Sequence, residues 1–464
     1  MTAAPAILHG PILPTLLRLA VPNVFAMVAA TAVGIGETLY VGQLGNVPLA
    51  AMALVFPFVM LMQMFSAGAM GGGVSSAISR ALGAGQPERA RALAVHALCI
   101  GLGLGLFFML ALWIGGPWLY RALGGTGEVL AEARTYGFWV FAAVPAIWML
   151  NTLISLVRGS GDMRVPSVTI LAVSLLQVAI GGTLGLGLLG APRLGMPGVA
   201  LGQVIAWWAA AAALWWFVRR EGARVPLVLG GVRLQWPLFQ DILRVGALAC
   251  LSPLLTVGTV MVVTSLVAVH GSDALAGYGI GARLEFLLVP IAFGVGVAAV
   301  PMVGMAIGAR DVQRARRVAW TAGAVSAALL GAIGLTVSVA PDAWAGWFTQ
   351  DANVLEHART YLRCAGPGFA FLGLGLTLYF AAQGAGNVVA PVGAAFLRFV
   401  FVLGVGTALG SGAAPWMLFA TVGGAMAVYG VLTAVGVHFS TWSPALRPAP
   451  PAGPQPPLGP SGTR

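Results

Sequence analysis

The sequence predicts an all-α membrane protein whose 12 transmembrane helices form two pseudo-symmetric lobes of six helices each. Hydrophobic residues make up 59% of the 464-residue chain and charged residues only 8%, which is more apolar surface than a soluble protein of this size can bury. Twelve apolar segments are long enough, at about 20 residues, to cross a bilayer as a helix. The two halves of the chain also repeat each other, as in many secondary transporters.

The internal repeat has one constant offset of 225 residues. Residues 133–136, Ala-Arg-Thr-Tyr, recur unchanged as residues 358–361. Because all matches share one spacing and one position relative to the apolar segments, we interpret them as a 6+6 duplication, with the substrate path between the halves. The other matched pairs are residues 158–162 with 383–387 and residues 81–91 with 306–316.

The apolar segments set the boundaries of the predicted spans in order along the chain. After a cytoplasmic N-terminus at 1–14, the N-lobe of residues 15–220 holds spans at 15–41, 48–71, 92–114, 135–157, 165–190 and 196–218. After a cytoplasmic linker at 221–240, the C-lobe of residues 241–442 holds spans at 241–269, 277–301, 318–341, 360–382, 389–410 and 416–440. Residues 443–464 are rich in proline and glycine without an apolar period, which predicts a disordered cytoplasmic tail.

All 24 basic residues are arginine. The absence of lysine excludes an ordinary P-loop ATPase, whose phosphate loop ends in Gly-Lys-Ser/Thr, and any enzyme that forms a lysine Schiff base. Energy for transport is therefore expected from an ion gradient, a partner or the solute's own gradient. The net charge of +11 does not indicate nucleic-acid binding, because the arginines lie in short loops between apolar spans.

These arginines are distributed unequally between the two sides of the predicted membrane topology. By the positive-inside rule, the richer side is cytoplasmic, and both termini lie on it. The start of the chain lacks a basic segment followed by a cleavage site, so we expect no removable signal peptide. The richer loops hold Arg80, Arg89, Arg91, Arg158, Arg164, Arg219, Arg220, Arg224, Arg233, Arg310, Arg314, Arg316 and Arg317, whereas the opposite loops hold Arg121, Arg134, Arg193, Arg359 and Arg363.

Cysteines and histidines are too scattered to predict a metal site or a bound cofactor. The three cysteines, Cys99, Cys250 and Cys364, lie far apart in sequence, and the five histidines fall mostly near span ends. Neither set has the spacing of metal ligands, and a disulfide role is not indicated. We therefore expect no metal and no cofactor.

Among the ionisable residues inside predicted spans, where each is costly and typically faces a polar interior, four are candidates for function. They are Glu37, Arg283, Glu285 and Arg398. Each half contributes one acid, but the offset of 225 does not relate the two acids, so they are not simply inherited from the duplication. Arg283 and Glu285 are two residues apart and should not pair directly on a helix. Arg398 is expected either to neutralise an acid, to meet an anionic group of the substrate or to form a structural ion pair.

A carboxylate in a poorly hydrated cavity can exchange a proton or a sodium ion for a cationic solute, which is antiport in its simplest form. Glu37 and Glu285 are the candidates for this ion-coupling role. The structural alternatives are that Glu37 lies near the membrane surface and that Glu285 pairs with an arginine. Pro22 interrupts helical hydrogen bonding and supplies either a bend used in gating or a static kink.

Several motifs together resemble the multidrug and toxic compound extrusion (MATE) family over nearly all of residues 15–440. Their order, the 6+6 duplication and the loop lengths carry the resemblance, and the last motif is most similar to bacterial DinF-like members. The motifs are Leu-Ala-Val-Pro at 19–22, Glu-Thr-Leu-Tyr-Val-Gly-Gln-Leu-Gly at 37–45, Leu-Gly-Ala-Gly at 82–85, Arg-Gly-Ser-Gly-Asp at 158–162 and Tyr-Gly-Ile-Gly-Ala-Arg-Leu-Glu at 278–285.

The resemblance implies two lobes facing each other in a V, in a bacterial inner-membrane protein that exports amphipathic, often cationic compounds against proton or sodium flow. Pro22 matches a proline whose bending is linked to coupling, and Glu37 matches a position that is often aspartate. Where the family often carries asparagine and, four residues later, aspartate, this chain has Gln177 and Gly181. Coupling then rests on Glu37 with Gln177 or on Glu285. The candidate polar residues of the cavity are Gln177, Tyr40, Tyr278, Arg283 and Arg398.

The function expected from this resemblance is multidrug efflux by a secondary transporter. Its partners would be a small amphipathic solute and the lipid bilayer, and we expect a monomer. The alternative function is a flippase for a lipid-linked or anionic amphipathic substrate, whose cavity should carry several basic residues for pyrophosphate. An intramembrane enzyme is not expected, because the chain lacks clustered carboxylates, metal-binding patterns and nucleophile dyads. The natural substrate and the coupling ion stay open.

Overall fold

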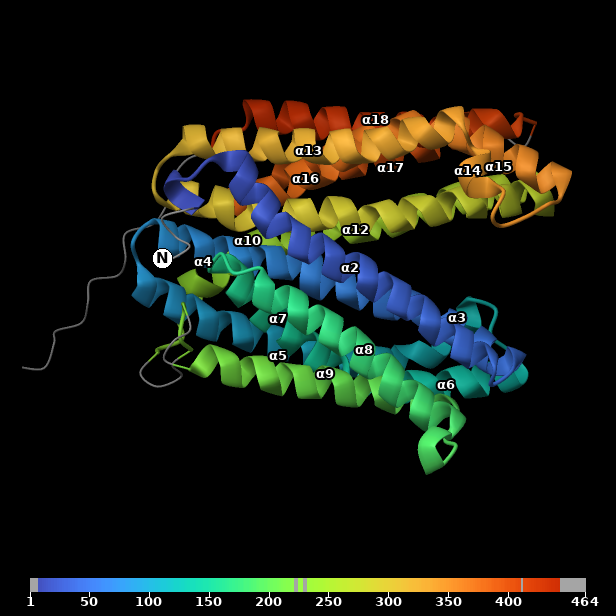
Figure 1. Ribbon diagram of the computed structural model, residues 1–464, viewed down its shortest axis with the longest axis horizontal. Helices are drawn as coiled ribbons and strands as arrows, with labels where there is room; N and C mark the ends of the chain where they lie inside the picture. The colour runs from blue at the N-terminus through green and yellow to red at the C-terminus, as the bar shows by residue number, and fades with distance from the viewer. Residues whose placement is uncertain (1–6, 221–223, 228–231, 410–411, 443–464) are drawn as a thin grey trace, which may run out of the picture.

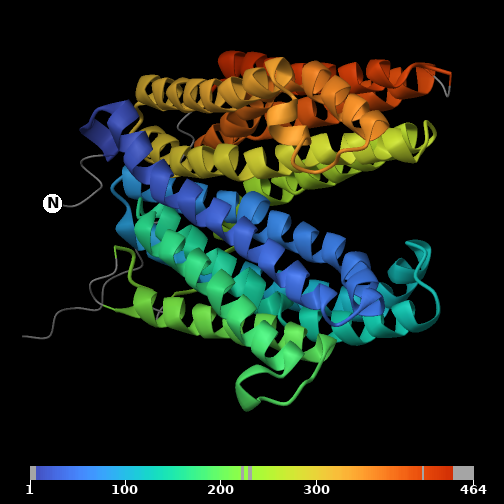
Figure 2. The same ribbon diagram turned by 45° about the vertical axis from the view of Figure 1, so that its right-hand side comes forward.

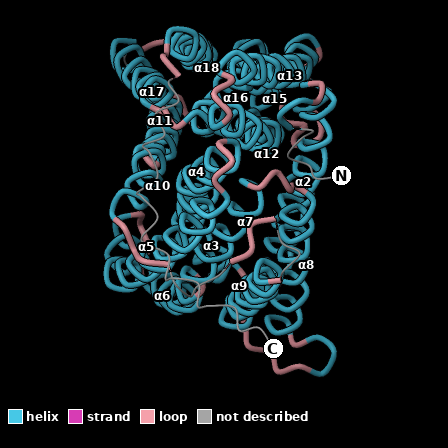
Figure 3. The backbone as a smooth tube through the Cα atoms, turned by 90° about the vertical axis from the view of Figure 1, so that its left-hand side faces the viewer, coloured by secondary structure: helices cyan, strands magenta, loops and turns pink. Residues whose placement is uncertain are grey.

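The computed structural model describes residues 7–220, 224–227, 232–409 and 412–442. Every regular element in these residues is a helix (Figure 3). Twelve helical segments are long and apolar enough to cross a membrane. This confirms the predicted all-α class and the number of spans. The predicted tail at 443–464 lies outside the described residues.

The helices follow one another as the sequence repeat requires. The N-terminal half contains α2 (Ile12–Gly42), α3 (Asn46–Gln63), the π-helix η1 (Met64–Met70), α4 (Gly71–Gly83), α5 (Pro87–Ala122), α6 (Gly127–Ala142), α7 (Val144–Gly159), α8 (Arg164–Leu186), the 3-10 turn η2 (Leu188–Gly190) and α9 (Met196–Arg219). The C-terminal half contains α10 (Trp236–Ala249), α11 (Leu251–Ala268), α12 (Ser272–Gly308), α13 (Val312–Val339), α14 (Asp342–Ala345), α15 (Ala352–Ala365), the 3-10 turn η3 (Gly366–Gly368), α16 (Phe369–Ala385), α17 (Val389–Leu409) and α18 (Pro415–Phe439).

Several helices extend beyond the predicted spans. The span predicted at 92–114 is part of a helix that runs from Pro87 to Ala122, and α10 begins at Trp236, inside the predicted linker. An apolar run ends at the first charged residues, whereas the helix continues out of the hydrocarbon region. Four spans also contain breaks that the hydropathy pattern does not mark. They are the π-helix after α3, the junction of α6 and α7, the junction of α10 and α11, and the turn between α15 and α16.

Two bodies of helices meet at one end and lie apart at the other (Figures 1 and 2). In Figure 1 the helices α2 to α9, blue to green, form the lower body, and α12 to α18, yellow to red, form the upper body. Contact between the bodies is made by α12 against α2 and α4, and by α4 against α10 and α16. We name the region where these helices touch the closed end and the opposite region the splayed end. The predicted V of two lobes is confirmed.

A symmetric pair of glycines allows the backbones to touch at the closed end. A Cβ on Gly83 would lie 2.1 Å from the carbonyl oxygen of Met305, and a Cβ on Gly308 would lie 2.1 Å from the carbonyl oxygen of Arg80. The repeat offset of 225 relates Gly83 to Gly308 and Arg80 to Met305. The duplicated glycines therefore form the same helix contact twice, once from each half.

The first helix of each half packs partly on the other half at the closed end. Leu16 and Ala20 of α2 belong to a buried cluster with Met302 of α12, while Ile242 of α10 belongs to the buried cluster of the N-terminal half. Packing at this end therefore crosses the lobe boundaries expected from the sequence. Those boundaries, 15–220 and 241–442, stay a prediction.

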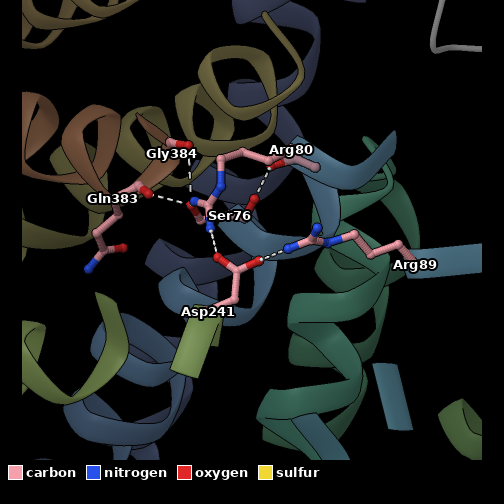
Figure 4. A network of polar contacts seen from close by, with 7 residues as sticks. Ser76, Arg80, Arg89, Asp241, Gln383 and Gly384 are labelled. Carbon is pink, nitrogen blue, oxygen red and sulfur yellow. Dashed lines mark hydrogen bonds and ion pairs between the residues drawn. The ribbon is translucent and has the colours of Figure 1, made fainter. Parts of the chain in front are cut away.

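Polar contacts also join the two bodies at the closed end (Figure 4). Asp241 of α10 binds Arg80 at 2.7 Å and Arg89 at 3.0 Å. Arg80 also donates to the hydroxyl of Ser76, which in turn donates to the carbonyl oxygens of Gln383 and Gly384 on α16. The side-chain amide of Gln383 donates to the Gly68 carbonyl oxygen at 3.2 Å.

The arginine-rich loops and both ends of the described chain gather at the closed end. Arg314 donates to the carbonyl oxygens of Ile7 and Gly10, and Arg316 donates to the carbonyl oxygen of Ser440. The acids of the predicted site lie toward the other end, because α2 runs away from the closed end and α12 runs toward it. Glu37 is five residues before the end of α2, and Glu285 is 13 residues after the start of α12.

Candidate functional site

Glu37 is the centre of a polar cluster inside the N-terminal body. Its side chain is buried within the protein, with 4% exposure. The side-chain amide of Gln177 on α8 donates to one carboxylate oxygen at 2.6 Å, and that of Gln203 on α9 donates to the other at 2.8 Å. Each oxygen of this carboxylate therefore meets one neutral donor. The predicted proximity of Glu37 and Gln177 is observed.

The two glutamine amides are oriented by aromatic residues behind them. The indole of Trp207 donates to Gln177 Oε1 at 3.1 Å, which turns the amide NH2 of Gln177 toward Glu37. The amide of Gln203 lies 3.4 Å from the hydroxyl oxygen of Tyr136. Polar side chains that are themselves hydrogen-bonded have few alternative orientations. We define the N-lobe cluster as Glu37, Gln177, Gln203, Tyr136 and Trp207.

Tyr40 occupies the space that the departure at position 181 leaves. A Cβ on Gly181 would lie 2.7 Å from the Tyr40 hydroxyl oxygen, so a side chain at 181 requires Tyr40 to move. The hydroxyl of Tyr40 is buried and has no hydrogen-bond partner among the described residues. An acidic side chain at position 181 would therefore clash with Tyr40 in its present place.

Glu285 is the acid of the C-terminal body, and its setting differs from that of Glu37. The hydroxyl of Tyr361 on α15 donates to the Glu285 carboxylate, and the ring of Tyr278 lies edge-on to Tyr361 with centroids 5.4 Å apart. Glu285 is half-buried, and no basic group lies within 4.0 Å of its oxygens in the described part of the chain. Glu285 is therefore not part of a direct ion pair.

The two arginines predicted inside spans each contact an aromatic ring. Arg283 is exposed, with its guanidinium 5.5 Å from the centre of the Phe348 ring. Arg398 of α17 is half-buried and lies 5.7 Å from the centre of the Tyr429 ring. As the spacing of two residues predicts, Arg283 does not bind Glu285. We define the C-lobe cluster as Glu285, Tyr361, Tyr278, Arg398 and Tyr429.

Pro22 lies inside α2, and the helix continues through it. The adjacent Asn23 is buried at the contact between the bodies. Its amide donates to the Gly294 carbonyl oxygen of α12 at 3.3 Å, and it accepts a hydrogen bond from Arg158 at 2.9 Å. The proline therefore lies where α2 passes from the closed end toward Glu37. Its proposed role in gating stays a prediction.

The sequence reading missed the residues that hold the two acids in place. Gln203, Trp207, Tyr136 and Tyr361 were not among its candidates. One signal was available, since the repeated tetrapeptides end in Tyr136 and Tyr361, and each tyrosine lies in the polar cluster around the acid of its own half. The duplication therefore preserves a tyrosine beside each acid, although the acids themselves come from helices that are not equivalent.

The repeated arginine two residues before this tyrosine forms a separate contact at the surface in the second half. Arg359 binds Asp342 at 2.7 Å. The hydrogen bond from Arg359 holds the pKa of the Asp342 carboxyl below its ordinary value. This contact joins α15 to α14 at the protein surface. Arg359 is not part of the C-lobe cluster.

No three ligand-type side chains come together in the described residues to form a metal site. The three cysteines are free. Of the acids described above, Glu37 and Glu285 bind neutral donors.

Two segments of the chain match the family model described as MatE, residues 22–182 and 249–408. The chain belongs to the MATE family. The two matched segments correspond to the two halves of the internal repeat. The DinF-like branch suggested by residues 278–285 stays a prediction.

Curated relatives in this family span most of the chain. A probable multidrug resistance protein NorM from Thermotoga maritima is 23% identical over 81% of both chains. A FAD transporter from Shewanella oneidensis is 24% identical over 81% of this chain and 82% of its own. A probable multidrug resistance protein from Bacillus subtilis is 27% identical over 66% of this chain and 65% of its own.

Solved MATE structures have the same fold. A MOP superfamily transporter from Pyrococcus furiosus, reported to have a binding pocket of reverse polarity, superposes with a TM-score of 0.86 at 22% identity and covers 94% of this chain and 98% of its own. A multidrug resistance MATE transporter in an outward-facing conformation superposes with a TM-score of 0.85 at 23% identity, covering 95% and 97%. At these identities the likeness concerns the fold. The protein is a multi-pass membrane protein of the MATE fold.

Proposed function

We propose that this protein is a secondary active transporter that exports amphipathic, cationic organic compounds in exchange for protons or sodium ions. The observation that carries the proposal is that each half holds one carboxylate inside a span, bound to neutral donors and without a direct cationic partner. A charged carboxylate inside a membrane is energetically costly, and such residues typically serve a function there. A proton, a sodium ion or the positive charge of a solute can each neutralise it in turn.

The two acids differ in a way that suggests a division of roles. Glu37 is almost fully buried and held by two amide donors, a setting suited to a small ion. Glu285 is half-buried and borders the rings of Tyr278 and Tyr361, a setting suited to the positive group of an aromatic or lipophilic solute. We therefore assign ion coupling first to Glu37, and we keep Glu285 as a second candidate. Gln177 and Tyr40 act with Glu37.

We further propose a bacterial cytoplasmic membrane location with the closed end toward the cytoplasm. The gathering of arginine-rich loops and of both ends of the described chain supports this orientation under the positive-inside rule. The splayed end would then face outward, in keeping with release of an exported solute. Pro22 would provide the flexibility that α2 needs when the closed end opens.

The proposal includes a monomeric transporter without enzymatic activity, resident metal or bound cofactor other than the transported ion. Both helical bodies come from one chain, which is in keeping with a monomer. The multidrug resistance names of several relatives support a drug-like solute.

Uptake of ethidium into everted vesicles tests the proposal, with a proton gradient or a sodium gradient imposed separately. We expect one gradient to drive uptake and Glu37→Gln to abolish it. The matched control is Glu88→Gln, because Glu88 is an exposed acid that forms an ion pair with Arg91. Glu285→Gln separates the roles: a loss of ethidium binding with proton or sodium flux retained assigns Glu285 to the solute. Uptake that neither gradient drives, with Glu37→Gln like the wild type, refutes the proposal.

A further inference from the structure

One repeated arginine in each half reaches across to the other half at the closed end. The offset of 225 relates Arg89, near the start of α5, to Arg314, near the start of α13. Arg89 binds the carboxylate of Asp241 on α10 at 3.0 Å (Figure 4). Arg314 donates to the carbonyl oxygens of Ile7 and Gly10, which precede α2, at 2.8 and 2.7 Å. Equivalent arginines therefore hold the beginning of the opposite half.

The backbone just before each first helix is also held by the opposite half. The same offset relates Gly10, which Arg314 binds, to Gln235. The backbone N–H group of Gln235 donates to Nε2 of His96 on α5 at 2.8 Å. His96 is fully buried, and the centre of its ring lies 4.6 Å from that of Phe239 on α10. The two halves therefore exchange their leading segments at the closed end.

Ile7 is an apolar contact of the N-terminal segment that touches both bodies. Its side chain is 2% exposed and belongs to a buried cluster with Met302 and Met305 of α12. A Cβ on Gly161, in the loop between α7 and α8, would overlap Cδ1 of Ile7. Gly161 has a φ of +84°, a left-handed conformation that favours glycine, so no side chain at this position displaces Ile7. Ile7 therefore lies between a loop of one body and a helix of the other.

Separation of the two bodies at the closed end must disturb these contacts. The helix α2 packs on α8 of its own body as well as on α12 of the other, so separation pulls residues 7–10 away from Arg314 or from Gly161. The helix α10 packs on α4 and α5, but the chain continues from it into α11, which packs on α17 of the C-terminal body. Separation therefore also pulls α10 away from Arg89. Hydrogen bonds made by a charged guanidinium are stronger than those between neutral groups.

We propose that two equivalent latches keep the closed end shut in the resting protein. The N-terminal latch is residues 7–10 held by Arg314, and the linker latch is residues 235–241 held by Arg89 and His96. Both latches must release before this end can open. The inference goes beyond the export function, because it holds for any solute and any coupling ion.

Thiol labelling without solute or gradient tests the two latches. In the full chain with its native cysteines replaced by alanine, Ser79→Cys reports on the closed end, because Ser79 is fully buried where α4 meets α12. We expect Arg314→Gln and Arg89→Gln each to raise the rate of reaction with a water-soluble maleimide about tenfold or more. Ile7→Ser should act in the same way, whereas Ile7→Leu, which conserves the apolar volume, should label as slowly as the parent chain.

Double variants show which residues belong to one latch. Arg314→Gln combined with Ile7→Ser should label little faster than either single variant, because both changes release the N-terminal latch. Arg314→Gln combined with Arg89→Gln should give about the product of the two single increases, because the latches have no residue in common. A product of increases in the first pair would contradict the assignment of Ile7 and Arg314 to one latch.

Arg91→Gln is the matched control, because Arg91 belongs to the same repeated motif but pairs with Glu88 within α5. We expect it to leave labelling at Ser79→Cys unchanged. A second reporter, Val267→Cys, lies in the core of the C-terminal body with 1% exposure, and no latch variant should speed its labelling. Rates at Ser79→Cys in Arg314→Gln and Arg89→Gln that equal the rate in Arg91→Gln overturn the inference. An increase of the same size at Val267→Cys means general loosening and also overturns it.

The labelling experiment is independent of transport. If ethidium uptake fails but the latch variants speed labelling at Ser79→Cys alone, the export function fails and the latches stand. If uptake is driven by a gradient but the latch variants label like the parent chain, export stands and the latches fail.

Discussion

Alanine at the two symmetric glycines should force the closed end apart. The Cβ of Gly83→Ala would lie 2.1 Å from the carbonyl oxygen of Met305, whereas ordinary contact begins at 3.4 Å. The helices α4 and α12 must therefore separate by about 1.3 Å at this point, because a backbone carbonyl cannot turn away as a flexible side chain can. Gly308→Ala makes the same demand against the carbonyl oxygen of Arg80.

The expected size follows from the cost of overpacking, about 1 to 3 kcal/mol. A conformation that is open at this end is free of the clash. The equilibrium between the closed and the open conformation should therefore shift toward the open one by about 5- to 150-fold. The double variant should shift by less than the product of the single shifts, because one separation of α4 from α12 relieves both clashes.

Thiol labelling at Ser79 measures this shift. Ser79 is fully buried, and a Cβ on Gly304 across the contact would lie 1.9 Å from its Oγ. In a chain whose native cysteines are replaced by alanine, Ser79→Cys should react slowly with a water-soluble maleimide. Gly83→Ala or Gly308→Ala should raise the rate by about 5- to 150-fold, in proportion to the shift toward the open conformation.

The control for this experiment is Gly279→Ala, also in α12, where a Cβ meets nothing within 4 Å. We expect it to leave labelling at Ser79→Cys unchanged. Labelling rates in Gly83→Ala and Gly308→Ala that equal the rate in this control would refute the role of the glycine contacts in closing this end.

Two further predictions concern the N-lobe cluster. Gln203→Leu removes one of the two amide donors to Glu37. Because a hydrogen bond to a charged group contributes about 1.5 to 3 kcal/mol, we expect gradient-driven uptake to fall about tenfold or more while ethidium binding persists. Uptake equal to that of the wild type would contradict the placement of Gln203 in the coupling cluster. Gly181→Ala should lower the free energy of unfolding by about 1 to 3 kcal/mol through its clash with the Tyr40 hydroxyl. Adding Tyr40→Phe should restore that stability, because the clashing oxygen is gone. A thermal unfolding scan in detergent in which the double variant is no more stable than Gly181→Ala would argue against this contact.

The sequence alone determined the class, the number of spans and the duplication. These follow from composition and from a repeat, which depend on local residue types and their spacing. It also identified Glu37, Glu285 and Arg398, because an ionisable residue in an apolar run stands out before its neighbours are known. The family resemblance pointed to Gln177 as a neighbour of Glu37.

The tertiary structure alone decided what surrounds each charge. Gln203 and Trp207 lie on α9, far from Glu37 in sequence, and no periodic pattern links a glutamine to a distant carboxylate. Arg398 and Glu285 come from different helices, so only packing shows that they share a cluster without pairing. The role of Gly83 and Gly308 likewise appears only when two helices from different halves are brought together, because a helix contact depends on the partner's surface as well as on its own residues.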